Sequence, residues 1–590
     1  AGIEAALASS RMGCSTLLLT LSRSLPGCLS CNPAIGGVGK GHLVRELDAL
    51  GGEMARAADA AGIQFRTLNA SKGPAVWSSR VQVDRDLYAA CIRNVLEQQE
   101  RLVIEEAELS EVVVSSGRVA GIRTACGSFV ACRCVVVAAG TFLNGLMHFG
   151  METRPGGRME EPLTSRLLPA CLRDLGFSLR RFKTGTCCRL DGTTVDLSSL
   201  RRQDGEIPPR PFSLATERIE RPQLPCYVTY TTEETHEVIR SHLDRSPLYS
   251  GKITGTGVRY CPSIEDKVVK FPHHPRHHIF LEPETQRADT WYPNGVSTSL
   301  PPDAQEEFIR TIPGLERATI VRYGYGIEYE VIDSRRLYPT LSAREIEGLF
   351  FAGQVNGTTG YEEAAAQGVV AGINAALLVR DEEPFLLDRS TSYIGVLLDD
   401  LTSVGTDEPY RIFTSRVERR LALREDNADI RLGMEGRRLG LLDDLRWQRI
   451  EAMRTQMEKW RPLLDRVSIT HNGRQVRLRE ALAALDLLHP APLPGTDVDA
   501  EVLRRLAIEA KYEPYVRRLD TLLSEQDEID RVRVPPNIRY DSIPGLSLEA
   551  REKLSRTRPM TLGQARRIPG ITPAAIMVLA VYLGNKPGGR

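Results

Sequence analysis

The first twenty residues show the pattern of a helix followed by a strand. AGIEAALASSR has small apolar residues at helical spacing, and Thr16–Thr20, TLLLT, is an apolar run of strand length. A dinucleotide-binding unit needs a strand, a glycine-rich turn and then a helix, in that order. Two interpretations follow. Either Gly2 is the last glycine of such a turn, with the first strand lying before Ala1, or this is an ordinary helix that opens with Ala-Gly.

Two later segments also combine a strand with a glycine turn. Arg133–Gly145 is a β-branched run that ends in AAGTFLNG. Gly348–Val379 contains LFFAG, a Gly/Asn/Thr turn and a long helix of small residues from about Tyr361. Glu362 and Glu363 stand in the first turn of that helix, where acidic side chains suit the helix dipole. The pattern predicts one doubly wound α/β domain that is interrupted by an insertion.

The insertion and the C-terminal part differ in composition and in the spacing of their apolar residues. Residues 186–318 are richer in Pro, Thr and Tyr and alternate like strands, whereas helical spacing dominates later, as in Ser415–Asn427 and Arg437–Lys459. The chain closes on a near-repeat, IPGLSLEAREKL and IPGITPAAIMVL, in which a Pro-Gly turn precedes a Ser or Thr that can cap a helix. Because 590 residues are too many for one core, we predict four segments: 1–185, 186–318, 319–380 and 381–590.

Composition and charge exclude few classes of function. Hydrophobic residues make up 42% of the chain and charged residues 26%, and Lys+Arg and Asp+Glu balance at 76 each, so an RNA-binding surface would have to be a local patch. No apolar run approaches the roughly 18 residues of a membrane span, and we expect no signal peptide and no membrane association. All 12 cysteines lie at or before Cys261. Reduced thiols indicate an intracellular protein, by default cytoplasmic, although an organelle matrix would look the same.

The stretch SCNPAIGGVGKGHLV is the first candidate site. A P-loop would need a glycine where Ala34 stands and a hydroxyl residue where Gly41 stands, so we reject an ATP or GTP site. What remains is a glycine-rich turn with Cys31 at its mouth and Lys40 beyond it. Either Lys40 or a nearby helix start would lower the pKa of the thiol. The alternatives are a structural loop with an inert Cys31 and, less favoured, a redox pair with Cys28 as in a disulfide reductase.

The stretch GTGVRYCPSIEDKVVKF is the second candidate site. Cys261 follows Arg259 and precedes Glu265, Asp266 and Lys267. A thiol, cations and carboxylates on one loop suit covalent and acid–base chemistry, and the alternative is a solvated charged loop.

The stretch FPHHPRHHIF holds four histidines. Metal sites usually add Cys or carboxylate ligands at suitable spacing, and this stretch has none, so we predict a surface cluster and no metal. The four are His273, His274, His277 and His278.

Taken together, a series of long motifs resembles one family from end to end. In chain order the motifs are SCNPAIGGVGKGHLVRELDALGG, NASKGPAVWSSR, QVDRDLY, GTFLNG, RYCPSIEDK, IFLEPE, YPNGVSTSLP, FFAGQVNGTTGYEEAAAQG, DDLTSVGTDEPYRIFTSR and TPAAI. The chain is similar to the MnmG (GidA) family, the FAD-dependent subunit of an enzyme that installs carboxymethylaminomethyl groups on tRNA wobble uridines.

The resemblance implies a fold, cofactors and partners. The fold would be α/β, with an FAD-binding Rossmann-like domain of glutathione-reductase type, an inserted NAD-binding α/β domain and an all-α C-terminal domain. NADH would reduce FAD, methylenetetrahydrofolate would supply the one-carbon unit, and glycine or ammonium would supply the nitrogen. The protein would be a homodimer that binds tRNA and forms a heterotetramer with an MnmE-type GTPase docked on the C-terminal domain.

The resemblance also implies site residues. The FAD positions and their neighbours would be Ala1, Gly2, Asn32, Lys72, Leu109, Gly140, Thr141, Thr164, Gln354, Gly360, Tyr361 and Glu362. The NAD segment would comprise Gly257, Val258, Arg259, Tyr260, Pro262, Ser263, Ile264, Glu265, Val268, Val269, Lys270 and Phe271. The catalytic residues would be Cys31, Cys261, Asp266 and Lys267, with Glu265 as an alternative proton carrier. A thiolate that adds to C6 of uracil makes C5 nucleophilic, which explains the need for cysteine.

Two departures from the family pattern affect these expectations. The chain has Cys187 and Cys188 in KTGTCCR where the family usually has two prolines, so we expect a looser loop. No acidic residue ends TLLLT, so the carboxylate that usually binds the ribose is not evident.

A tRNA-modifying flavoenzyme is therefore the function that we predict. One alternative is a folate- and FAD-dependent tRNA uridine methyltransferase relative, although such proteins lack the long helical C-terminal part. Another is a non-catalytic flavin-containing scaffold that binds RNA or a GTPase. Clustered arginines predict a salt-sensitive tRNA surface, the alternative being a solvated helix face: Arg411, Arg416, Arg419, Arg420 and Arg424, with Arg517 and Arg518.

Overall fold

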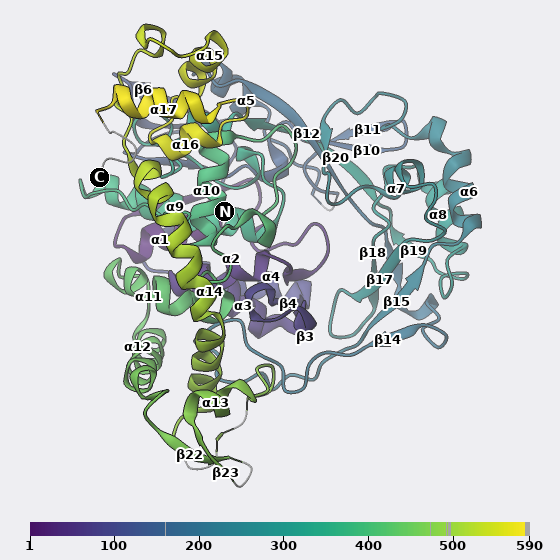
Figure 1. Ribbon diagram of the computed structural model, residues 1–590. Helices are drawn as coiled ribbons and strands as arrows, with labels where there is room; N and C mark the ends of the chain where they lie inside the picture. Colours follow the sequence, from purple (N-terminus) through teal and green to yellow (C-terminus); the bar gives the residue numbers. More distant parts are fainter. Residues whose placement is uncertain (160, 472–473, 491, 494–496, 585–590) are drawn as a thin grey trace.

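The computed structural model describes residues 1–584 apart from 160, 472–473, 491 and 494–496. The N-terminal and C-terminal parts of the chain together form the larger body (Figure 1). The middle of the chain forms a separate lobe that carries β14, β15, β17, β18 and β19, drawn on the right of Figure 1. The fold is α/β with a helical C-terminal part.

The larger body contains two pairs of parallel strands. β1 (Thr16–Thr20) pairs with β5 (Leu102–Glu106), and β9 (Val135–Val137) pairs with β21 (Leu349–Phe351). The parallel strands that the sequence predicts are confirmed. Since β9 and β21 are far apart in sequence, the chain leaves this body and returns to it.

Two helices of small residues pack closely beside these strands. α1 (Gly2–Arg11) lies against α9 (Tyr361–Val379). A side chain at Gly368 would overlap the carbonyl oxygen of Ala1, and one at Gly372 would overlap that of Ala5. The small residues on both helices are therefore needed for this close approach.

The lobe is built on a six-stranded antiparallel sheet with the order β14-β15-β17-β18-β13-β19. Its helices α6, α7 and α8 bury side chains such as Ile239, Val268 and Phe308 with Ile279 and Leu281 of the sheet. The helices thus cover one face of the sheet. The element bounds are β13 Arg189–Asp191, β14 Arg201–Gln203, β15 Cys226–Tyr230, α6 Glu233–Ser241, α7 Ile264–Lys270, β17 His278–Pro283, β18 Thr290–Asn294, α8 Pro302–Arg310 and β19 Ile320–Arg322.

A five-stranded sheet joins the lobe to the larger body. Its long antiparallel pair, β12 and β20, buries Phe182, Tyr329 and Val331. The order is β11-β10-β20-β12-β16, with bounds β10 Leu146–Phe149, β11 Glu152–Pro155, β12 Leu179–Thr186, β16 Thr256–Gly257 and β20 Tyr325–Ile332. A three-stranded sheet, β2-β4-β3, lies in the body beside the lobe, with bounds β2 Ala34–Gly36, β3 Gly62–Leu68 and β4 Ser78–Val83. A second three-stranded sheet is β6 Leu109–Ser115, β7 Arg118–Thr124 and β8 Phe129–Ala131.

The C-terminal part is helical, but one predicted helix is wrong. Ser415–Asn427 forms only short 3₁₀ turns, because local hydrogen bonds replace helical ones: the side chain of Asn427 accepts from the N–H of Arg424 and donates to the carbonyl oxygen of Ala422. The predicted helix Arg437–Lys459 is two helices, α11 (Ala428–Arg438) and α12 (Asp444–Trp460), separated at a left-handed Gly440. A hairpin of β22 and β23, Ser468–His471 and Arg474–Arg477, interrupts the helices.

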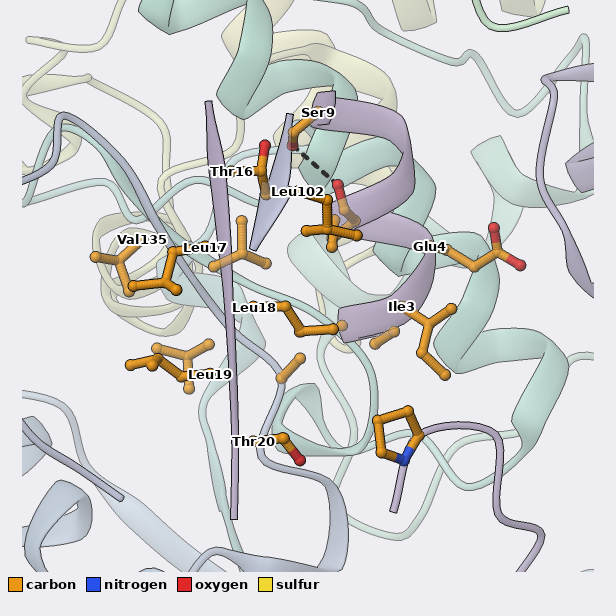
Figure 2. Close-up of a pocket in the computed structure, with 18 of the residues that line it drawn as sticks. Ile3, Glu4, Ser9, Thr16, Leu17, Leu18, Leu19, Thr20, Leu102 and Val135 are labelled. Atoms are coloured by element: carbon orange, nitrogen blue, oxygen red, sulfur yellow. Dashed lines mark hydrogen bonds between the residues drawn. The ribbon is translucent and has the colours of Figure 1, made fainter. Parts of the chain in front are cut away.

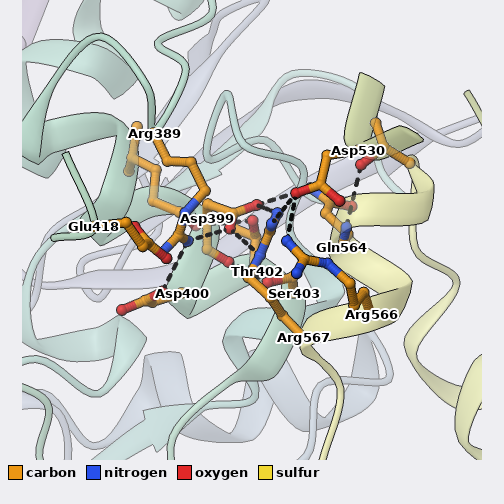
Figure 3. A network of polar contacts seen from close by, with 12 residues as sticks. Arg389, Asp399, Asp400, Thr402, Ser403, Glu418, Asp530, Gln564, Arg566 and Arg567 are labelled. Carbon is orange, nitrogen blue, oxygen red and sulfur yellow. Dashed lines mark hydrogen bonds and ion pairs between the residues drawn. The ribbon is translucent and has the colours of Figure 1, made fainter. Parts of the chain in front are cut away.

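The last helices form a small bundle that rests on the larger body. As the near-repeat predicts, Ser547 caps α15 and Thr572 caps α17 through their side chains. Arg567 reaches Asp399 at the end of α10 and Asp530 in α14 (Figure 3). Ion pairs therefore hold the bundle against the core. The bounds are α10 Tyr393–Asp399, α14 Ala500–Arg531, α15 Leu548–Thr557, α16 Leu562–Arg567 and α17 Pro573–Tyr582.

Candidate functional site

A large cavity lies between the two parallel strand pairs. Its volume is about 1070 Å³, and its walls are mostly apolar side chains of β1, β9 and the start of α1 (Figure 2). Of the predicted flavin residues, Ala1, Gly2, Leu109 and Tyr361 line it. The cavity therefore meets the N-terminal ends of α1 and α9, where free backbone N–H groups suit the anionic parts of a nucleotide cofactor. That Gly2 closes a glycine-rich turn stays a prediction.

Other predicted flavin residues form the turn that follows β9. Thr164 accepts a hydrogen bond from the N–H of Gly145 (2.8 Å) and donates one to the carbonyl oxygen of Phe142 (2.9 Å). Thr141 donates to the carbonyl oxygen of Gly157 at 2.9 Å. A side chain at Gly140 would contact Gln354. These residues therefore shape one turn, although they come from distant parts of the sequence.

Lys72 lies elsewhere. It is exposed at the end of a 3₁₀ turn, Ala70–Lys72. Beyond the turn, the N–H of Ala75 donates to the hydroxyl of Tyr512 on α14 at 3.2 Å. Lys72 is not among the described residues that line the cavity, and its predicted cofactor role stays a prediction.

The glycine-rich stretch packs backbone against backbone. Gly36 has a φ of 90°, and a side chain there would overlap the carbonyl oxygen of Ser79 on β4. Lys40, at the start of α2 (Lys40–Ala49), places its Nζ 2.7 Å from Glu362 and 3.3 Å from Glu363. The glycines therefore allow close packing, and the lysine neutralises the two acids of α9 in place of a phosphate.

Cys31 is held by residues from three distant parts of the chain. The Nη2 of the buried Arg189 donates to the carbonyl oxygens of Ser30 and Cys31, each at 3.2 Å, while its Nε pairs with Glu284 at 3.0 Å. The N–H of Cys31 donates to the hydroxyl of Tyr361 at 2.7 Å. These bonds fix the backbone that carries the thiol.

The hydroxyl of Tyr292 completes the surroundings of Cys31. It lies 3.3 Å from the sulfur, accepts a hydrogen bond from the N–H of Cys187 at 3.3 Å, and has the Arg189 guanidinium 4.7 Å from its ring centre. Sequence reasoning missed Arg189 and Tyr292. The sequence pointed to them only by placing them in two family motifs, KTGTCCR and YPNG. Their spacing along the chain does not indicate that they contact Cys31.

The thiol of Cys31 is not activated in the way that the sequence predicts. Burial raises its pKa, and the nearby Cys261 adds to the rise, while the Tyr292 hydrogen bond and the charge of Arg189 act in the opposite direction. The predicted lowering by Lys40 is wrong, because Glu362 and Glu363 neutralise that lysine.

Cys261 lies in the same site as Cys31, on a loop that follows the two-residue strand β16. Besides its effect on Cys31, its thiol influences the pKa of Lys267 and of Arg411, which places all four groups in one electrostatic neighbourhood. The loop touches the C-terminal part of the chain through Tyr260, whose ring centre is 4.6 Å from that of Phe413. The thiol of Cys261 is thus near enough to that of Cys31 to raise its pKa.

The three charged residues after Cys261 point to different partners. Lys267 donates from Nζ to the carbonyl oxygen of Gly295 at 2.8 Å, and burial lowers its pKa, which the nearby Cys187 and Cys261 thiols partly offset. Asp266 pairs with Lys270 at 2.7 Å. Glu265 is fully buried and accepts from the N–H of Ser299 at 2.9 Å. Lys267 thus lies in the electrostatic surroundings of two thiols.

Several residues of the predicted NAD segment have defined places. Ser263 caps α7, and Ile264 and Val268 belong to the core of the lobe. Val269 and Phe271 are exposed. The rest lie on or next to the Cys261 loop: Gly257, Val258, Arg259, Tyr260 and Pro262. Their contact with a cofactor stays a prediction.

Cys187 and Cys188 lie in the core of the lobe. Burial raises the pKa of Cys187 to about 12. The carbonyl oxygen of Cys187 accepts a hydrogen bond from Arg189 at 2.8 Å. The loop that we expected to be looser without prolines is thus held by Arg189 and Tyr292.

The predicted arginine surface is wrong for two of its members. Arg411 faces the site, where it donates to the carbonyl oxygen of Thr359 at 3.0 Å. Arg424 is buried and pairs with Asp426 at 2.9 Å. The predicted helix Ser415–Asn427 does not form, so the arginines do not share one helix face. Arg420, Arg517 and Arg518 are exposed.

The histidine stretch forms a cluster of rings. The ring of His277 lies tilted against that of His236 with centres 5.2 Å apart, and burial lowers the pKa of His277 to about 4. Within the described part of the chain, no group of three or more His, Cys, Asp and Glu side chains is placed to hold a metal ion. Over those same residues, no helix is long and apolar enough to span a bilayer.

The fold and the site define an α/β protein with a large, mostly apolar cavity, two neighbouring thiols and a helical C-terminal part. Comparisons agree. The profile of the family described as glucose inhibited division protein A matches residues 1–383, and that of the tRNA modifying enzyme MnmG/GidA C-terminal helical bundle matches residues 524–589. The chain belongs to the MnmG (GidA) family.

Its relatives are similar over nearly their whole length. The tRNA uridine 5-carboxymethylaminomethyl modification enzyme MnmG of Syntrophotalea carbinolica is 48% identical, with 99% of this chain and 97% of the relative covered. The enzyme of the same name from Geobacter metallireducens is 49% identical, with coverages of 99% and 96%. The crystal structure of Aquifex aeolicus GidA (form II) superimposes with a TM-score of 0.91 at 46% identity, covering 99% of this chain and 97% of that one.

Proposed function

We propose that this protein is a flavoenzyme that adds a carboxymethylaminomethyl group to C5 of the wobble uridine of tRNA. The observation that carries the proposal is the convergence of Cys31 and Cys261 in one site of a chain that belongs to the MnmG family. Relatives that share nearly the whole chain bear the name of this activity.

The residues around the large cavity suit FAD. Its apolar volume of about 1070 Å³ matches a cofactor with a large aromatic ring. Gly360 is the N-cap of α9 and has no side chain to cap it, so the first N–H groups of that helix are available to the ring. Ala1, Gly2 and Leu109 would contact the rest of the cofactor, and Thr164 and Gln354 would support it through the turn after β9. Bound FAD, reduced by NADH, would supply the redox chemistry for the one-carbon unit.

The thiols would act on the uracil ring. A thiolate, from Cys31 or Cys261, would form a bond to C6 and push the C5–C6 π electrons onto C5 and the carbonyl. C5 would then bond to the one-carbon unit, a base would take the C5 proton, and the C–S bond would break. Lys267 is placed to influence the proton balance, because its pKa is lowered and it lies near Cys261.

The lobe and the C-terminal bundle would provide the other contacts. We assign the NADH contacts to the loop and helix from Gly257 to Phe271, which carries Cys261. The bundle of residues 524–584 matches the family's C-terminal helical module and would bind an MnmE-type GTPase in a heterotetramer of two homodimeric proteins. Methylenetetrahydrofolate would donate the one-carbon unit, in a cytoplasmic setting.

The experiment is a reconstituted reaction. The full chain, loaded with FAD, would be mixed with tRNA, NADH, methylenetetrahydrofolate, glycine and the GTPase partner with GTP, and nucleosides would be analysed by mass spectrometry. We expect carboxymethylaminomethyl-uridine. Formation of 5-methyluridine would support the methyltransferase alternative, and flavin that NADH does not bleach would support the scaffold.

A further inference from the structure

The antiparallel sheet in the lobe has its three helices on one face. α6, α7 and α8 cover the face that contains Ile279 and Leu281. Side chains alternate between the faces of a strand, so the residues opposite one another in register form rows on the other face. The inner row is Gln203, Cys226, Glu282 and Tyr292, the middle row is Arg201, Val228, Phe280 and Asn294, and the outer row is Tyr230 and His278. Cys226 and Val228 are buried.

The inner row packs on the larger body beside the thiol. Glu282 pairs with Arg80 at 2.6 Å, and Tyr292 reaches Cys31 at 3.3 Å. The one carboxylate of these three rows is thus buried and neutralised. The face then continues from the catalytic cysteine outward, towards the exposed end of the sheet.

The outward part is a chain of rings and cations in which Arg201, Arg276 and His278 are exposed and Tyr230 and Phe280 are half-buried. The guanidinium of Arg276 lies 4.2 Å from the ring centre of Tyr230, and that ring is 4.7 Å from His278. His278 stacks on Phe280 with an interplanar angle of 17° and centres 6.3 Å apart. We call Arg201, Tyr230, Arg276, His278 and Phe280 the outer strip.

We propose that the outer strip binds the unpaired nucleotides of the tRNA anticodon loop that flank the target uridine. Sequence-tolerant proteins that bind single-stranded RNA stack bases on aromatic side chains of a sheet face and contact phosphates with arginine. The outer strip offers both groups, and it is continuous with the row that touches Cys31. A uridine at the thiol would thus have its neighbours on Phe280, His278 and Tyr230.

The proposal rests on the proposed function, and one binding assay separates the two. Fluorescein-labelled tRNA transcript with uridine at the first anticodon position would be titrated with the full chain at several salt concentrations. The variants are Tyr230→Ala, His278→Ala and Arg276→Ala. The matched control is Arg287→Ala, an exposed arginine of the same lobe that pairs with Asp289. NADH-dependent bleaching of the flavin and melting temperature are measured in every variant.

Tyr230→Ala should weaken tRNA binding about tenfold, because one base–aromatic stack is lost. Arg276→Ala should reduce the slope of log K against log salt by about one phosphate contact. The control, the flavin bleaching and the melting temperature should match the wild type. If all three variants bind tRNA as tightly as the wild type, the proposed role of the outer strip is wrong and the proposed function stands. If the wild type does not bind tRNA, the proposed function itself is wrong.

Discussion

The two cysteines reach the site on segments that are held in different ways. Cys31 stands on a backbone fixed by hydrogen bonds with Arg189 and Tyr361. Cys261 stands on a loop that is anchored by side chains, with an Arg259–Glu408 ion pair at 4.0 Å and the Tyr260–Phe413 ring contact. The first segment is anchored in the core, and the second at the surface.

The difference indicates that the two thiols differ in mobility during the reaction. Breaking a buried ion pair leaves a charge without a partner and is costly, whereas an exposed pair contributes little. The Cys261 loop can therefore be displaced at low cost when substrate or NADH binds, while Cys31 keeps its position. We expect perturbations of the Cys31 segment to affect folding and chemistry together, and perturbations of the Cys261 loop to affect chemistry alone.

Arg189→Ala should have the largest effect on folding. It removes one of the two arginines that pair with the buried Glu284, leaving Arg85 at 3.4 Å, and it frees the backbone of Cys31, so the free energy of unfolding should fall by about 3 kcal/mol. Arg259→Ala, the matched change on the other loop, should cost less than about 1 kcal/mol. Urea unfolding followed by tryptophan fluorescence measures both. Equal losses would contradict the comparison.

Cys31→Ala and Cys261→Ala should each reduce tRNA modification by a factor on the order of 10² or more, because a thiol that bonds to or protonates the substrate is lost. NADH should still bleach the flavin in both variants. Cys126→Ala removes an exposed thiol far from these loops and is the control. If only one of the two variants loses activity, the cysteine replaced in that variant is the single nucleophile.

Tyr292→Phe should change the pH dependence of Cys31. The thiolate is the reactive form, and burial raises the pKa of Cys31, so alkylation by iodoacetamide should accelerate with rising pH. The Tyr292 hydrogen bond lowers that pKa, and its removal should move the midpoint to higher pH and slow alkylation at neutral pH about tenfold. Peptide mass spectrometry follows each cysteine separately. A midpoint that stays put or moves to lower pH would show that Tyr292 does not stabilise the thiolate.

Replacing both Cys187 and Cys188 with proline should have the smallest effect. Proline at 187 removes one N–H bond to Tyr292 of 3.3 Å, a loss of about 1 kcal/mol. The lower entropy of the unfolded chain offsets part of it. Melting temperature and modification rate should stay close to wild type. A large loss of activity would mean that one of these buried thiols takes part in the reaction.

The strands and long helices could be predicted because their patterns are local. TLLLT became β1 over the same residues, and the helix expected from about Tyr361 begins there as α9. The Ser547 and Thr572 caps followed from their place after Pro-Gly turns. The expected helix Ser415–Asn427 does not form because the Asn427 side chain hydrogen-bonds to the local backbone, and side chains such as Arg419 pair with distant residues such as Asp520 instead of with helical neighbours.

The site could be predicted only where a motif pointed to it. The two cysteines stood out in the sequence, but their surroundings are made by residues brought together by the insertion. Arg189 and Tyr292 come from β13 and β18 of the lobe, and Glu284 follows β17. Arg411 was assigned to a surface because its sequence neighbours are charged, whereas its position depends on a contact with Thr359. No local sequence pattern encodes such tertiary contacts.

The most direct test of the account is nucleoside mass spectrometry of bulk tRNA from cells that lack this protein. We predict that carboxymethylaminomethyl-uridine disappears, returns with the wild-type gene, and does not return with Cys31→Ala or Cys261→Ala when both variants accumulate to wild-type levels. An unchanged nucleoside profile in the deleted cells would contradict the proposed function. Full restoration by both variants would contradict the role of the two thiols.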